Sequence, residues 1–442
     1  MDDGSGDVRR LEPGQIFGVL AGLSGTSRMA TATAVEDSEV LLVVEEDLHK
    51  SEGAAELAWG WLQAMASRGR PLVETRDALI GTSKVRRNVQ QTRLPSIDVI
   101  RKVAASLLPE GLEGYIDGGA GDELTVKENE SAWRDLQLLP HVLTGVDKRD
   151  TGVEVLGRKH PHPLLVAPTG FQRLTHPDAE IACARGAAAT GATFCLSTFA
   201  TTSPQDLQAA VPGLHWWFQL YWFTDRDLNW ALVDKAVEAG AEAILLTVDL
   251  ATLGSREHDR HTGFSLRGSM VMPVIAATGR HPTSKLTPIW NMLDPGLKWS
   301  DLEELVERSP LPVIVKGLVR ADDAVKSIDH GAGGVVVSNH GGRQLDTAVS
   351  TARALPAVAD AVGDRAAVLV DGGIRRGADV AKALALGADA VLIGRPPLWG
   401  LAQGGEEGVQ HVLTLLQSEF DNAMALLGVT HTGDLSRDLI AD

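Results

Sequence analysis

The feature that most constrains the fold is a series of short apolar runs that alternate with alanine-rich segments from about residue 163 onward. Each run is almost continuously apolar, as parallel strands buried on both faces are, and the segments between the runs have helical spacing. The runs are PLLVAPTG from Pro163, ATFCLST from Ala192, HWWFQLY from His215, AILLTVD from Ala243, PVIVKG from Pro312, GVVVSNH from Gly334, AAVLVDG from Ala366 and AVLIGR from Ala390. Eight such units within about 240 residues predict a closed (β/α)8 barrel.

An open, doubly wound sheet is the alternative for a chain with this alternation. The polar residues favour the barrel, because each lies at the carboxyl end of its run, and in a barrel these ends converge on one mouth. They are Thr169, Ser197, Gln219, Tyr221, Thr247, Asp249, Lys316, His340, Asp371 and Arg395. We therefore predict an α/β protein with a (β/α)8 TIM barrel and a small N-terminal β-containing segment.

The length of 442 residues exceeds what one hydrophobic core usually fills, so two domains are expected. We predict a small β-containing segment over 1–55, a helical linker over 56–95 and the barrel over 96–442. Residues 96–150 precede the first barrel strand and combine a helix with the glycine-rich stretch GYIDGGAGDELTVKENESAW. We expect this part to cap one end of the barrel.

Charge and cysteine content narrow the possible partners and the location. The chain has 41 basic and 58 acidic residues, a net charge of −17, which disfavours nucleic acid or an anionic membrane as a partner. No apolar run reaches about 18 residues, and MDDGSGDVRR lacks the order of a signal peptide, so a cytoplasmic location is predicted. Cys183 and Cys195 lie in apolar, alanine-rich surroundings, which favours buried thiols over a disulfide or a metal pair.

One connection is far longer than the others. About 60 residues separate Asp249 from Pro312, with proline and glycine scattered among them. Long loops inside compact domains are usually lids or disordered segments. We predict a mobile flap over the mouth of the barrel, with an inert insertion as the alternative.

The polar cluster at the strand ends indicates acid–base chemistry beside an anion. Asp249 is placed to hold one imidazole nitrogen of His340, which leaves the other nitrogen free as a general base. Arg343, three residues after the histidine, and Arg256, in the neighbouring loop, are suited to a carboxylate. A base next to a carboxylate anchor suggests that a proton is removed from an atom close to that carboxylate.

A second cluster predicts a phosphate site. The stretches DGGIRRG, from Asp371 to Gly377, and IGR, from Ile393 to Arg395, follow the seventh and eighth predicted strands. Barrels frequently bind phosphate at this place, with glycine amides and a helix N-terminus as donors. Lys316, at the end of the fifth predicted strand, would place a positive charge under a cofactor held there.

These residues resemble a known family, the FMN-dependent 2-hydroxy acid oxidases and dehydrogenases, which includes glycolate oxidase and the flavin lactate and mandelate dehydrogenases. The resemblance runs from about residue 96 to the C-terminus. It rests on YIDGGAGDE, APTGFQ, FQLYW, TVDLATLGSR, SNHGGRQLD, LVDGGIRRGADV and LIGRP, which occur in the family's order. It implies oxidation of an L-2-hydroxy acid to the 2-oxo acid, with electrons passing to FMN and then to oxygen or another acceptor.

For the substrate, the resemblance implies one cluster that binds and deprotonates it. His340 would take a substrate proton while hydride or its equivalent reaches flavin N5, and Asp249 would pair with His340. The residues that would bind the carboxylate or hydroxyl group, or line the substrate pocket, are Arg256, Arg343, Tyr115, Tyr221 and Phe199. The family also implies a homo-oligomer, a tetramer or an octamer, and no metal.

For the cofactor, the resemblance assigns residues from most of the strand ends. Lys316 would stabilise the negative charge that develops at flavin N1 and O2 on reduction. The isoalloxazine would be lined by Ala167, Thr169, Gly170, Ser197, Gln219 and Thr247. The ribityl chain and the phosphate would be held by Asp371, Gly373, Arg375, Gly394 and Arg395.

Three departures from the family's pattern leave the specificity open. Gly170 occupies a position, alanine or glycine in members, that bears on the reaction with oxygen, so oxidase, dehydrogenase and monooxygenase activities are all possible. Phe199 replaces a frequent tryptophan, and DLATLG replaces the more usual DTPVLG. The alternatives are a scaffold that oxidises an amine of a peptide-derived precursor, or an inactive nucleotide sensor.

The first fifty residues resemble the second half of a cyclic-nucleotide-binding domain. Within Leu11 to Lys50 the positions that match are Phe17, Gly18, Arg28, Ala30 and Thr31, whereas Val19 stands where the ribose-binding glutamate would be. The first half of that jelly roll is missing from the pattern. We predict a structural remnant that binds no cyclic nucleotide, with nucleotide binding as the alternative.

Overall fold

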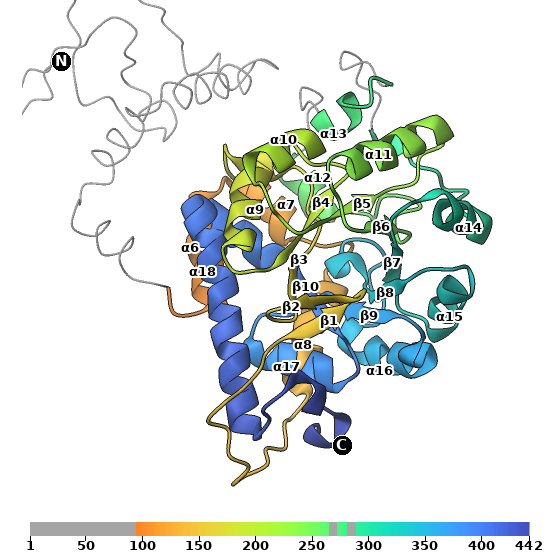
Figure 1. Ribbon diagram of the computed structural model, residues 1–442. Coiled ribbons are helices and arrows are strands. Elements are labelled where there is room, and N and C mark those ends of the chain that lie inside the picture. Colours follow the sequence, from red (N-terminus) through yellow and green to blue (C-terminus); the bar gives the residue numbers. More distant parts are fainter. Residues whose placement is uncertain (1–93, 265–271, 281–288, 442) are drawn as a thin grey trace, which may run out of the picture. The chain divides into compact units, whose positions relative to one another are not determined.

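The structure is a computed structural model that describes residues 94–264, 272–280 and 289–441. Eight parallel strands close into a barrel in the order β10-β3-β4-β5-β6-β7-β8-β9, and helices surround it (Figure 1). The strands are β3 (Leu164–Val166), β4 (Thr193–Ser197), β5 (Trp216–Leu220), β6 (Ile244–Thr247), β7 (Val313–Leu318), β8 (Gly334–Val337), β9 (Ala367–Val370) and β10 (Ala390–Ile393). Seven of them lie within their apolar runs and β7 ends one residue beyond its run, so the predicted (β/α)8 barrel is confirmed.

The strands carry two hydrophobic cores because successive side chains point to opposite faces. Leu165, Trp217 and Leu245 belong to a core inside the barrel. Their chain neighbours, such as Val166 and Phe218, belong to a larger core between the strands and the helices. Burial on both faces is the reason that the runs show no alternation of apolar and polar residues.

The surrounding helices follow the strands in the manner of βα units. They are α9 (Ala179–Ala188), α10 (Pro204–Ala210), α11 (Arg226–Glu238), α14 (Trp299–Arg308), α15 (Ala321–Asp329), α16 (Thr351–Val362), α17 (Gly377–Ala385) and α18 (Arg395–Leu427). The long helix α18 packs against α9, α17 and the preceding helix α6 (Ile97–Leu107). No helix of the described ranges is long and apolar enough to cross a membrane.

A hairpin that the sequence analysis did not predict precedes the barrel. Strands β1 (Val153–Val155) and β2 (Arg158–His160) pair antiparallel. Val155 is buried and packs in the core inside the barrel, against residues such as Leu165 and Trp217. The hairpin therefore fills space inside the barrel with an apolar side chain.

The glycine-rich stretch before the hairpin forms α7 (Glu110–Asp117) and α8 (Leu124–Asp135). The Asp346 carboxylate accepts hydrogen bonds from the backbone amides of Leu124 and Thr125, at 3.4 and 2.8 Å, at the N-terminus of α8. A carboxylate is stabilised at this end of a helix by the helix dipole. The loop after β8, which carries Asp346, is thus fastened to α8.

The connection between β6 and β7 contains α12 (Glu257–His261), α13 (Pro273–Ala276) and α14, and residues 265–271 and 281–288 within it lie outside the described residues. The mobility of this connection stays a prediction.

Cys183 and Cys195 are free and fully buried, as predicted, and burial raises the pKa of both thiols. The predicted segment 1–55, with its cyclic-nucleotide-like residues, and almost all of the linker 56–95 also lie outside the described residues.

Candidate active site

The carboxyl ends of the strands converge on one pocket, as the barrel predicts. Every site residue proposed from the sequence lines this pocket except Asp249, which lies behind His340. The residues from the strand ends and loops are Tyr115, Ala167, Thr169, Gly170, Ser197, Phe199, Gln219, Tyr221, Thr247, Arg256, Lys316, His340, Arg343, Asp371, Gly373, Arg375, Gly394 and Arg395. The pocket also has apolar walls that the sequence analysis did not name, formed by Leu112, Ile116, Phe171, Leu174, Leu250 and Leu398.

His340 is held from one side and open on the other. Its Nδ1 lies 2.8 Å from Oδ1 of Asp249, and its Nε2 lies 3.5 Å from the Tyr221 hydroxyl. Burial raises the pKa of Asp249, but the neighbouring His340 and Lys316 outweigh this effect and hold the pKa below its usual value. Because an ionised carboxylate only accepts hydrogen bonds, Nδ1 carries the proton and Nε2 is free to accept one.

Lys316 is a buried cation in the wall of the pocket. Its Nζ lies 3.2 Å from an Asp371 carboxylate oxygen and donates to the Ser338 hydroxyl at 3.0 Å. Burial lowers the pKa of Lys316, but Asp371 and Asp249 together raise it above the usual value. Lys316 therefore stays charged, and the same Ser338 hydroxyl accepts a hydrogen bond from the His340 backbone amide at 3.1 Å.

Arg343 brings a positive charge to the substrate side of the pocket. Its Nη1 donates to the carbonyls of Tyr115 and Gly118, at 2.7 and 3.0 Å, and within the described ranges it bonds to carbonyls only. Burial, together with repulsion from Arg256, lowers the pKa of Arg343 to about 10. The Arg256 Nε is also buried and lacks a hydrogen-bond partner among the described residues. Two partly buried cations that repel each other and have no carboxylate partner among the described residues favour an anion between them.

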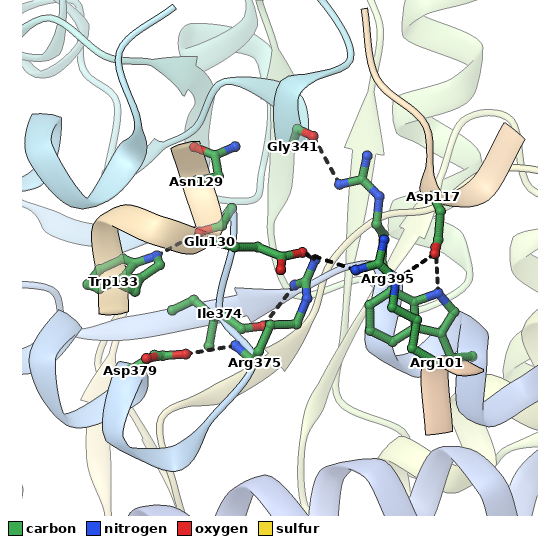
Figure 2. A network of polar contacts seen from close by, with 12 residues as sticks. Arg101, Asp117, Asn129, Glu130, Trp133, Gly341, Ile374, Arg375, Asp379 and Arg395 are labelled. Carbon is green, nitrogen blue, oxygen red and sulfur yellow. Dashed lines mark hydrogen bonds and ion pairs between the residues drawn. The ribbon is translucent and has the colours of Figure 1, made fainter. Parts of the chain in front are cut away.

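Arg395 brings a further positive charge to the pocket next to Arg343, since both donate to the Gly118 carbonyl, and Figure 2 shows its guanidinium extending toward Gly341. It donates to the carbonyls of Ile116, Gly118 and Gly341 at 2.8 to 3.0 Å. Burial, followed by repulsion from two other arginines, lowers the pKa of Arg395 to about 9. A buried guanidinium bonded to neutral carbonyls is suited to a bound phosphate.

Arg375, a neighbour of Arg395, is partly neutralised by an acid. Its Nη2 forms an ion pair with Glu130 of α8 at 3.0 Å, and its guanidinium lies 5.0 Å from the centre of the Trp399 ring. Figure 2 shows the ion pair. Its Nε is buried and has no hydrogen-bond partner among the residues that the structure describes. Sequence analysis missed Glu130, because a single acid on a helix is usually part of a solvated face.

Several buried polar atoms in the pocket have no partner within the described part of the chain. They are Gln219 Nε2, Thr247 Oγ1, Asp371 Oδ1 and Arg375 Nε. The Gln219 Oε1 accepts from the Ser197 hydroxyl and from the Thr198 amide, at 3.1 and 3.2 Å, and this fixes Nε2 as the free donor. Unpaired buried polar atoms are rare and costly, so the pocket is built for a ligand with several hydrogen-bonding groups.

Gly170 and Phe199 approach each other closely at the edge of the pocket. A Cβ atom on Gly170 would lie 3.0 Å from the Phe199 Cβ and 3.2 Å from its carbonyl oxygen. The Phe199 ring stacks on Tyr221, with 4.8 Å between the ring centres. An alanine at 170 would therefore fit only if the neighbouring Phe199 gave way by a few tenths of an ångström.

A parallel barrel with a histidine–aspartate pair, a buried lysine and four arginines around one pocket at its mouth has the side chains that suit a phosphate-bearing cofactor and an anionic substrate. Residues 104–442 match the model of the FMN-dependent dehydrogenase family, and the chain belongs to this family. An L-lactate oxidase from a Nostoc species is 44% identical over 337 residues, which cover 74% of this chain and 92% of the relative. A 2-hydroxyacid oxidase from Dictyostelium discoideum is 40% identical, covering 82% of this chain and 95% of the relative.

Solved structures agree with the family. A mandelate oxidase in complex with (S)-2-phenylpropionate has a TM-score of 0.72 and 37% identity, and the match covers 79% of this chain and 98% of that chain. The chain is therefore an FMN-dependent oxidoreductase that acts on CH–OH groups of 2-hydroxy acids. The unpaired atoms of the pocket fit FMN, because Gln219, Thr247 and Asp371 offer hydrogen bonds for a ring and a polyol chain, and Arg375 a donor for a phosphate.

Proposed function

We propose that this protein oxidises an L-2-hydroxy acid with His340 as the base, Arg343 and Arg256 as the carboxylate clamp, and FMN held on the other side of the pocket. The observation that carries the proposal is the free Nε2 of His340, oriented by Asp249 at 2.8 Å in the same pocket as two arginines that lack a carboxylate partner among the described residues. The relatives named as L-lactate and 2-hydroxyacid oxidases support it.

The clamp sets the orientation of the substrate. The Arg343 Nη1 is fixed by the Tyr115 and Gly118 carbonyls, so its remaining donors are pre-oriented and lose little entropy on binding. The Arg343 and Arg256 guanidinium carbons lie 5.0 and 5.7 Å from the centre of the Tyr115 ring. A carboxylate bound there relieves the repulsion between the two cations, and this favours acids over neutral or amine substrates.

The base acts on the side of the substrate that faces His340. Its Nε2 accepts the substrate proton, and Asp249 stabilises the imidazolium that forms. The Tyr221 hydroxyl, 3.5 Å from Nε2, is placed to hold the substrate hydroxyl group near the base. Burial raises the pKa of Tyr221, so the phenol stays protonated and serves as a hydrogen-bond donor.

We assign FMN binding to the pocket residues whose buried polar atoms have no hydrogen-bond partner among the described residues. Gln219, Thr247 and Asp371 would bind the ring and the ribityl chain, and Arg375 and Arg395 the phosphate. FMN bound here supplies the two-electron acceptor for the substrate. Lys316, charged and buried beside Asp371, would balance the negative charge of the reduced cofactor.

Oxygen is proposed as the final acceptor, since the relatives compared here are named oxidases. Oxidation of an amine and a catalytically inactive sensor are not supported by these relatives, and the arginine clamp also opposes an amine. The oligomeric state and the cytoplasmic location stay predictions.

The test is anaerobic titration of the purified protein with a panel of 2-hydroxy acids of both configurations, followed by oxygen. We expect bleaching of the flavin absorbance by an L-2-hydroxy acid, none by the D isomer or by the matching amine, and rapid recovery in oxygen. Bleaching by the amine alone would refute the proposal. Slow recovery of the flavin absorbance in oxygen would leave the 2-hydroxy acid as the substrate, but it would show that oxygen is not the final acceptor.

A further inference from the structure

We infer that Asn129 of α8 is a positioning residue for His340. It lies outside the pocket and acts through Asn339, the residue that precedes the base. This inference rests on the proposed role of His340. Figure 2 shows Asn129 on the same helix as Glu130 and Trp133, facing the loops of the barrel mouth.

The two asparagines form a reciprocal pair. The Asn129 Nδ2 donates to the Asn339 Oδ1, and the Asn339 Nδ2 donates to the Asn129 Oδ1, both at 2.8 Å. Their exposed fractions are 2% and 6%, so these hydrogen bonds are shielded from water. Asn339 Oδ1 also accepts from the Gly342 amide at 3.2 Å, and its Nδ2 donates to the Val349 carbonyl at 3.1 Å. Each amide therefore has one allowed orientation.

The pair holds a turn that the chain would not adopt unaided. His340, Gly341 and Gly342 have φ values of 58°, 63° and 77°, which place three consecutive residues in the left-handed region. The left-handed conformation is unfavourable for His340 by an amount of order 1 to 2 kcal/mol, because histidine, unlike glycine, has a Cβ atom. Such a conformation persists only when surrounding contacts fix it, and the Asn339 carboxamide, held by Asn129, bonds directly across the turn to Gly342.

The helix that carries Asn129 is itself firmly placed. Trp133 donates its indole N–H to the Gly372 carbonyl at 2.8 Å, and the Asp346 carboxylate caps the N-terminus of α8. A Cβ atom on Gly373 would lie 1.9 Å from the Asn129 carbonyl oxygen, so α8 packs directly on the loop after β9. Asn129 thus links the turn that carries His340 to a helix whose position is fixed.

The experiment compares Asn129→Ala with Ser131→Ala, a control on the same helix whose hydroxyl bonds only within α8 in the described structure. Stopped-flow reduction over a range of substrate concentrations separates the limiting rate from the apparent dissociation constant. We expect the limiting rate of Asn129→Ala to fall by about 10- to 100-fold, the scale for a base misplaced by about 1 Å, with the dissociation constant little changed. Amide hydrogen exchange of 339–343 should accelerate, and Ser131→Ala should match the parent in both measurements.

Asn339→Ala tests the same pair from the other side if Asn129→Ala fails to fold. The double variant should be no slower than Asn339→Ala alone, because Asn129 acts on the turn through the Asn339 carboxamide. A parental reduction rate in Asn129→Ala beside a slow His340→Gln would overturn the inference. If His340→Gln is also unaffected, the base assignment has failed instead. Amide hydrogen exchange then tests by itself whether Asn129 holds the turn of His340. Unchanged protection of 339–343 in Asn129→Ala would show that it does not.

Discussion

Nδ1 of His340 lies 2.8 Å from Oδ1 of Asp249, although 91 positions separate the two residues in the chain. Asp249 follows β6 and His340 follows β8, while β7 between them carries Lys316. Three adjacent strand ends therefore supply the carboxylate, the buried cation and the imidazole. The hydrogen bond and charge interaction with His340 and the charge of Lys316 together explain why the pKa of the Asp249 carboxylate is low despite its burial.

The first prediction concerns the base. His340→Gln should leave FMN bound, because the proposed phosphate ligands Arg375 and Arg395 lie on other loops, while flavin reduction by substrate slows by about 10² to 10⁴. The measurement is anaerobic stopped-flow reduction together with the flavin content of the purified variant. A flavin-loaded variant that reduces at the parental rate would remove His340 from the mechanism.

The second prediction concerns the clamp. Arg343→Met should weaken both substrate binding and the transition state, at a cost of roughly 2 to 5 kcal/mol if the ion pair with the carboxylate is buried. Arg353→Met is the matched control, because that side chain is 63% exposed and its ion pair with Glu128 contributes about 0 to 1 kcal/mol. Steady-state kinetics on both variants make the comparison. Equal, small effects would show that Arg343 does not bind the substrate.

The third prediction concerns the phosphate. Arg395→Met should weaken the binding of FMN to the apoprotein by roughly 2 to 5 kcal/mol, since one partner of a buried charge pair is lost. Riboflavin, which lacks the phosphate, should lose far less affinity. Fluorescence titration of the apoprotein with the two flavins measures both. An equal loss of affinity for FMN and riboflavin would contradict a phosphate contact. It would indicate instead that the loops whose carbonyls accept hydrogen bonds from Arg395 have shifted.

The fourth prediction follows from the lowered pKa of Asp249. Because the folded-state pKa lies below the unfolded value of about 3.9, the ionised carboxylate stabilises the protein above that pH, and the contribution is lost as the pH falls through the folded-state value. The difference in unfolding free energy between the parent and Asp249→Asn should therefore shrink below about pH 4. Urea unfolding of the two apoproteins from pH 3 to 7 tests this, and a constant difference would contradict it.

The barrel was predictable because burial on both faces leaves a short, almost continuously apolar run at each strand. The site was predictable because most of its residues stand directly after those runs, where the chain order alone brings them together. The hairpin of β1 and β2 was missed, since strands of three residues that contain Arg158 and Lys159 show no periodic pattern.

The supporting contacts left no local signal. Asn129 and Asn339 are 210 positions apart, and neither looks unusual in its own segment. Glu130 reaches Arg375 only because α8 packs across the loop after β9. Contacts of this kind depend on tertiary packing between distant segments, and no pattern within either segment indicates them.

The close approach of Gly170 and Phe199 has a consequence for how this enzyme can diverge. Alanine at 170 would place its Cβ 3.0 Å from the Cβ and 3.2 Å from the carbonyl oxygen of residue 199. Every residue has this oxygen, and every L-amino acid except glycine has this Cβ. Exchanging the phenylalanine for another large side chain thus makes no room, and growth at 170 is coupled to a movement of residue 199 by a few tenths of an ångström.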